Sequence, residues 1–355
     1  MMIGTQNYYS LLDKLLAACS NFPPSTEESP MLYNFNKLMN ILQKKEIAGI
    51  VSDPAIIAGA HQLSVKFGYI TRSILTGEDP DPMQTYDALQ AEIEQSLSGP
   101  MYIYAKQWGL SVKALYYYKQ HNFEKALDYS LECVILNEYL IREGIFTLLF
   151  RAAEQNKNIS RIFFRSGNWQ AGATFAKDLL HYLLNGEPGQ LYGTIFREKT
   201  FWNEIPYVRE GYAYQCFRVM VSLMIHVEKR HPVIAPHLFP GIFGDLRFEI
   251  NTPDRQILAH WMHIRKAFHT GDYEEFLIEL LEFMHDPKCK IYDILKTDLL
   301  LETIKLVKKE TQYPGAAALL QNIGDYLENE LHAQEYLNKD LSAANLVSID
   351  DSPEK

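Results

Sequence analysis

The stretch YYYKQHNFEKALDYSLECVILN, Tyr116 to Asn137, decides the fold class of this chain. Its apolar residues recur at helical spacing on both sides of a short polar break at His121 and Asn122, which is typical of two helices joined by a tight turn. Ala114 and Ala126 stand where an antiparallel pair needs small side chains, near the close crossing of the two helices. The stretch therefore predicts a helical hairpin rather than a catalytic motif.

The rest of the chain repeats this pattern of helical periodicity between regular breaks. Proline-rich or glycine-rich segments such as NFPPSTEESP and TGEDPDP end the helices, and few segments alternate with the period of a strand. We predict an all-α protein, with a polar, acidic and disordered tail at 339–355. The expected helices span residues 31–46, 54–75, 83–97, 101–120, 123–154 with a break near Gly144, 159–165, 169–185, 207–230, 254–270, 273–286, 291–311 and 314–337.

Residues 107–140 resemble a tetratricopeptide repeat, whose unit is a 34-residue helix-turn-helix. Two further segments, Phe163–Leu180 and Ala267–Pro287, carry similar turns. Because the units are unevenly spaced, the resemblance implies a diverged tetratricopeptide-like helical-hairpin solenoid. We expect an N-terminal helical segment at 1–100, a helical repeat region at 101–338 and the tail.

Repeat folds of this kind resemble protein-binding and peptide-binding scaffolds, in which the first helix of each pair lines a concave face. The matching positions predict a basic and aromatic lining that selects an acidic peptide or another anionic ligand. The alternative is that its arginines pair with nearby carboxylates on a solvated face. The expected lining residues are Ser111, Leu115, Tyr118, Lys119, Lys157, Arg161, Phe164, Arg165, Trp261, Arg265, Phe268 and His269.

The bulk charge argues against nucleic acid and membranes as partners. The chain has 34 basic and 44 acidic residues and a net charge of −10, whereas both of those partners attract positive charge first. No apolar run is as long as a membrane span. The four cysteines lie far apart with no zinc-site spacing, so we expect buried, reduced thiols and a cytoplasmic location.

Motifs for catalysis, cofactors or metals are weak. Glu228/His231 and Glu282/His285 have the Glu-x-x-His spacing, but each pair stands at an expected helix end, where the helix dipole favours histidine. His260 and His263 are three residues apart without an accompanying HExxH motif. The chain contains no phosphate-binding glycine loop and no nucleophile motif. We therefore expect a non-enzymatic protein with neither cofactor nor metal.

A competing interpretation is a transcriptional regulator with an N-terminal helix-turn-helix at 63–75. In LSVKFGYITRSIL, Gly68 would form the turn and Arg72 would be the only basic residue on the reading helix. Residues 1–100 hold six basic and eleven acidic residues, so phosphate contacts would be few.

The segment His231–Pro253 has four prolines and no helical period, yet it is rich in apolar residues. It should pack against the protein rather than extend into solvent. Two roles stay open for it, a structural crossover and a loop that lines a ligand groove.

Overall fold

The structure is a computed structural model that describes residues 5–25, 30–199, 203 and 206–337. It contains helices and no strand within these residues, which confirms the all-α prediction. The predicted tail at 339–355 lies outside the described residues.

The chain divides into two compact units. Unit 1 comprises the described parts of residues 1–30 and 217–346, and unit 2 those of residues 31–216. This division differs from the expected one near residue 100. Leu63 and Phe67, before residue 100, share one core with Ala105 and Val112, which follow it.

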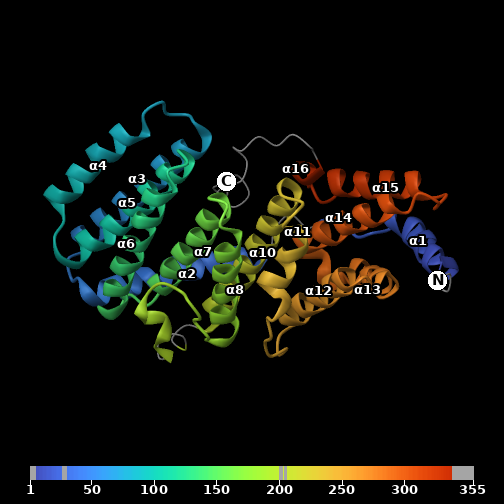
Figure 1. The fold of residues 1–355 in the computed structure, drawn as a ribbon. Helices are drawn as coiled ribbons and strands as arrows, with labels where there is room; N and C mark the ends of the chain where they lie inside the picture. The colour runs from blue at the N-terminus through green and yellow to red at the C-terminus, as the bar shows by residue number, and fades with distance from the viewer. Residues whose placement is uncertain (1–4, 26–29, 200–202, 204–205, 338–355) are drawn as a thin grey trace. The chain divides into compact units, whose positions relative to one another are not determined.

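Unit 2 is built from consecutive helices, and from α3 to α8 each packs on a neighbour in sequence (Figure 1). In order they are α2 (Pro30–Ile50), α3 (Pro54–Thr76), α4 (Pro82–Ser96), α5 (Gly99–Lys119), α6 (Phe123–Arg142), α7 (Leu148–Arg165), α8 (Trp169–Asn185), the 3-10 helix η1 (Thr194–Arg197) and the first part of α10 (Pro206–Arg230). Helix α5 packs on α6, α6 on α7 and α7 on α8.

Unit 1 joins the N-terminal helix to the C-terminal third of the chain. Its elements are α1 (Thr5–Cys19), the rest of α10, α11 (Ala235–Phe239), the π-helical turn η2 (Pro240–Gly244), α12 (Pro253–Thr270), α13 (Tyr273–His285), the 3-10 helix η3 (Pro287–Ile291), α14 (Asp293–Lys309), α15 (Ala316–Asn329) and α16 (Gln334–Leu337). Helix α1 packs against α13 and α15 (Figure 1).

Three helical hairpins, α5/α6, α7/α8 and α12/α13, share one turn chemistry. The residue before the cap has a positive φ in each, 59° at His121, 84° at Gly167 and 81° at Gly271. An Asn or Asp then caps the second helix by accepting a hydrogen bond from the backbone N–H three residues later. This confirms the helix pair predicted for Tyr116–Asn137.

The boundary between α6 and α7 differs from the prediction. The sequence suggested one helix over 123–154, broken near Gly144, and a separate helix at 159–165. In the structure α6 ends at Arg142, Gly144 has a φ of 108°, and α7 runs without interruption from Leu148 to Arg165. A positive φ suits glycine and ends a helix, so the break is real, but the helix after it begins earlier than predicted.

Candidate functional site

A pocket in unit 2 gathers basic and aromatic side chains. Its volume is about 290 Å³, and it is lined by residues of α3, α5, α6, α7 and the first part of α10. The charged lining residues are Arg151, Glu154, Lys157 and Arg161, all from α7, and the large aromatic ones are Trp108 and Tyr118 from α5. Three cationic side chains and one carboxylate give this pocket a positive charge in a chain whose net charge is −10.

Arg151 lies on the face of the Trp108 indole. Its guanidinium carbon is 3.8 Å from the ring centroid, which is a close cation–π contact. Arg151 Nη2 also donates a hydrogen bond to Ser111 Oγ at 3.1 Å, and the side chain forms an ion pair with Glu154. The stack and the ion pair hold the guanidinium plane in one orientation at the pocket wall.

The positive charges of the pocket also act on Glu154. Burial opposes ionisation of this carboxyl, but the nearby charges of Arg151, Lys157 and Arg161 outweigh burial and hold the pKa of Glu154 below its usual value. Glu154 is therefore ionised at neutral pH, and the pocket retains an excess of two positive charges when its lysine and arginines are protonated.

Several polar atoms at the pocket lack a hydrogen-bond partner among the described residues. They include Arg151 Nε, Trp108 Nε1 and Oε1 of Gln155, a side chain with no exposed surface. The amide nitrogen of Gln155 is satisfied, because it donates to Ser111 Oγ at 3.0 Å. Buried polar atoms without partners are costly, so water or a ligand that reaches them would bind favourably.

The structure brings some of the predicted lining residues together and separates others. Tyr118, Lys157 and Arg161 line the pocket, as do Ser111 and Leu115. Lys119 and Arg165 are half-buried and do not line it. Phe164 is 7% exposed and packs on α8, where a Cβ added to Gly172 would lie 2.7 Å from its ring. Phe164 therefore serves the close packing of α7 on α8.

The expected lining residues of the third hairpin belong to unit 1. Trp261 is completely buried, and Arg265 is 4% exposed. Phe268 is half-buried and packs on Tyr273 and Phe276, with ring centroids 5.7 and 5.1 Å away. Trp261 and Arg265 lie within the core and cannot meet a peptide, and Phe268 does not line the pocket of unit 2, so we leave these three residues out of the site.

Arg265 is instead the centre of a buried ion cluster. Its guanidinium lies 2.9 Å from Glu228, 3.1 Å from Asp298 and 2.6 Å from Glu302. Lys305 Nζ approaches Glu228 and Glu302 at 2.8 and 2.7 Å, and Trp261 Nε1 donates to Asp298 Oδ2 at 3.1 Å. The carboxylates of α14 explain why an arginine on α12 faces inward.

Sequence reasoning missed Trp108, Arg151, Glu154 and Gln155 as site residues. The predicted helix over 123–154 includes Arg151 and Glu154, whereas in the structure both residues belong to α7. Once α7 begins at Leu148, the spacing of Arg151, Glu154, Lys157 and Arg161 places them close to one face. A correct start for α7 would have placed Arg151 and Glu154 on the helical face of Lys157 and Arg161.

A second cavity, of about 430 Å³, lies in unit 1 along the segment 231–253. Leu238, Phe239, Ile242, Phe243 and Leu246 of this segment are buried, so the segment packs against the protein as predicted. Several of its residues also line the cavity, whose polar lining comes chiefly from Arg247, His263, Lys266 and His269. The crossover and cavity-lining roles of this segment therefore coexist.

The predicted helix-turn-helix at 63–75 is corrected by the structure. Residues 63–75 lie within the single helix α3, which runs from Pro54 to Thr76 through Gly68. The segment contains no turn, and its Leu63, Phe67 and Ile70 are buried in the core of unit 2. A reading helix that follows a turn is absent from this segment.

Comparisons with known proteins were negative. No family model, no curated protein and no solved structure matches the chain. Among the described helices, none is both long and apolar enough to cross a membrane.

Proposed function

We propose that this protein is a non-enzymatic, cytoplasmic binding scaffold of tetratricopeptide-like hairpins, and that the pocket of unit 2 selects an acidic peptide or another anionic group. One observation carries the proposal. Arg151, Lys157 and Arg161 converge with Trp108 and Tyr118 on one pocket in an otherwise acidic chain.

The chemistry of the pocket suits a carboxylate-bearing ligand. Guanidinium groups bind carboxylates through paired hydrogen bonds, and aromatic faces add apolar contact to the rest of a peptide. The unpartnered Gln155 Oε1 would accept a hydrogen bond from a peptide N–H. A cavity of about 290 Å³ holds one or two side chains, so the proposal is of a short anchoring motif and not of an enclosed metabolite.

Cys133 near the pocket supports a binding role rather than a nucleophilic one. Burial raises the pKa of this thiol to about 11, so the reactive thiolate is scarce at neutral pH. All four cysteines are buried and free, which is compatible with a reducing compartment.

The proposal is tested with a fluorescent glutamate-rich peptide and a lysine-rich peptide of the same length. We expect the acidic peptide alone to bind by fluorescence anisotropy, and its affinity to fall as salt is added. Equal binding of the two peptides, or affinity that is indifferent to salt, would contradict a basic recognition pocket.

The variant Arg161→Glu should weaken binding of the acidic peptide at least about tenfold, because it removes a charge-assisted contact and adds a repulsive charge. Arg197→Glu is the matched control, since Arg197 is an exposed residue of η1 in the same unit and does not line the pocket. Melting curves of both variants verify that the fold is retained. An equal loss in both variants would assign the effect to net charge.

A further inference from the structure

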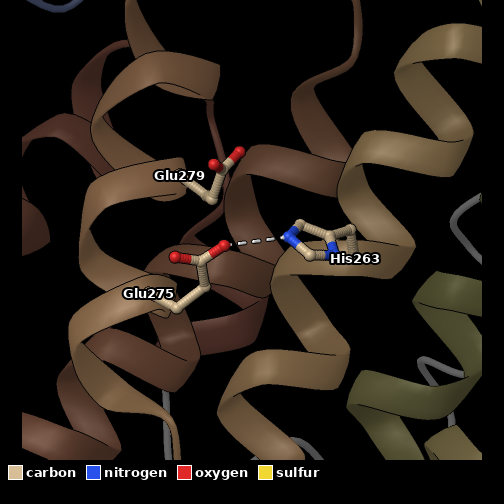
Figure 2. Close-up of side chains that lie close together, drawn as sticks. All are labelled: His263, Glu275 and Glu279. Carbon is tan, nitrogen blue, oxygen red and sulfur yellow. Dashed lines mark hydrogen bonds and ion pairs between the residues drawn. The ribbon is translucent and has the colours of Figure 1, made fainter.

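Two histidines of α12 face two glutamates of α13 across the third hairpin. His260 Nε2 lies 2.8 Å from Glu279 Oε2. His263 Nε2 lies 3.2 Å from Glu275 Oε1, and Figure 2 shows this second pair. The histidines are three residues apart on one helix and the glutamates four apart on the next, so each pair shares one helical face. The hairpin turn at Gly271 and Asp272 brings the two faces together.

Three of these side chains meet at one point. A ring nitrogen of His263 and one carboxylate oxygen from each of Glu275 and Glu279 all lie within 4.8 Å of one another. Figure 2 shows the imidazole of His263 directed toward the two carboxylates. Ligand atoms of a tetrahedral zinc site lie about 3.3 Å apart when the bonds are roughly 2.0–2.1 Å long. The 3.2 Å between His263 Nε2 and Glu275 Oε1 already fits this spacing, and a Glu279 oxygen lies within 4.8 Å of the other two ligand atoms.

We propose that His263, Glu275 and Glu279 form a binding site for a divalent transition-metal ion of the zinc type. The remaining coordination positions are open to solvent, because His263 is exposed and both glutamates are half-buried. An imidazole combined with carboxylates favours zinc and its neighbours over Mg²⁺ and Ca²⁺, which prefer oxygen ligands alone.

The charge balance of the cluster supports a cation. Among the described residues, the ion-pair partners of Glu275 and Glu279 are these two histidines, and no lysine or arginine pairs with either carboxylate. The two carboxylates lie one helical turn apart with no described lysine or arginine between them. A divalent ion supplies a positive charge there and joins α12 to α13.

His260 has a positioning role in this site. Its ring packs edge-on against Phe283, with centroids 5.4 Å apart, and its Nε2 holds the Glu279 carboxylate. An outer histidine of this kind orients a ligand without being one. The predicted absence of a metal site rested on the lack of an HExxH motif. Here the carboxylates come from the next helix, and a motif search within one helix does not find them.

The experiment is a calorimetric titration of the chelator-treated full chain with zinc chloride at neutral pH. We expect one zinc per chain with micromolar affinity, and no displacement by millimolar Mg²⁺. The variants His263→Ala and Glu279→Gln should each weaken zinc binding more than about tenfold, and His260→Ala should weaken it about tenfold. Zinc should also raise the melting temperature of the unmodified chain more than that of His263→Ala.

Matched controls are Glu282→Gln on the same helix and His231→Ala. Both residues are exposed and stand outside the cluster, so zinc affinity should not change. Zinc binding that persists unchanged in His263→Ala would overturn the proposal, because it would place the ion on other histidines. Absence of binding at micromolar zinc, or displacement by Mg²⁺, would overturn it as well. Circular dichroism of each variant shows that a loss of binding does not come from unfolding.

Discussion

Arg265 illustrates how the surroundings of one residue determine its role. It is an arginine with 4% exposure that contacts three carboxylates, and Lys305 compensates part of the remaining negative charge. A buried ion cluster gains little net stability over an apolar core, but removal of one central charge leaves its partners buried and uncompensated. Loss of Arg265 would therefore destabilise unit 1, because it would leave three buried carboxylates without their shared partner.

Asp298 makes this cluster sensitive to pH. Burial raises the pKa of Asp298 to about 7, although the charge of Arg265 opposes the shift. A carboxyl whose pKa is higher in the folded than in the unfolded chain holds its proton more tightly when folded. Its contribution to stability therefore falls as pH rises from about 4 to about 7.

Replacement Asp298→Asn should remove this contribution. The slope of the unfolding free energy between about pH 4 and pH 7 should become more positive by up to about 1.4 kcal/mol per pH unit. The substitution leaves two carboxylates opposite two cations, and its amide oxygen can still accept the hydrogen bond from Trp261. Urea unfolding across this pH range measures the slope. The exposed Asp245→Asn in the same unit is the control, and equal slopes in the two variants would contradict the prediction.

At the scale of the elements, the hairpin turns are alike in chemistry but not in strain. Gly167 and Gly271 adopt a positive φ at no steric cost, whereas His121 adopts a φ of 59° with a side chain present. The α5/α6 turn therefore contains local strain that the other two turns lack.

The variant His121→Gly should relieve that strain and stabilise unit 2 by up to about 1 kcal/mol, or roughly 2–4 °C in melting temperature. Loss of the edge contact between the His121 and Phe123 rings, 5.8 Å apart, reduces the gain. Gly167→Ala should have the opposite effect, because its φ of 84° disfavours any side chain. Thermal melting compares the two. A lower melting temperature for His121→Gly would show that the ring contact outweighs the backbone strain.

At the scale of the whole molecule, the N-terminal helix completes the C-terminal unit. Leu12 and Leu15 of α1 have no exposed surface, and Tyr313 Oη donates to Asp13 at 2.8 Å. Tyr326 Oη donates to the carbonyl of Pro23 at 2.7 Å. The first helix and the last third of the chain therefore share one core.

The variant Leu15→Ala should destabilise unit 1 by about 2–5 kcal/mol through the cavity it leaves. Hydrogen exchange should quicken in the amides of α13 and α15 as well as in α1, and should change little in α5–α8. Leu38→Ala in α2 is the control, since that leucine is 39% exposed. Faster exchange confined to α1 would show that α1 does not stabilise the helices on which it packs.

The sequence by itself determined the helices and the turns between them. Asn122, Asn168 and Asp272 cap helices through hydrogen bonds that span three residues, and Gly271 ends α12 through its own φ. These are local interactions, so a short window of sequence contains the information they need. For the same reason the bounds of α8, α10, α12 and α13 agree with prediction to within one residue.

Only the tertiary structure decided which helical faces meet. Lys157 and Arg161 reach a pocket because side chains of α5 and α7 line it together, whereas Arg265 is buried because α14 presents carboxylates to it. Ser111 and Trp261 occupy equivalent positions in their hairpins, yet Ser111 lines a pocket and Trp261 lies in the core. Burial depends on contacts between residues far apart in the chain, and helical periodicity does not specify the partner of an apolar or charged face.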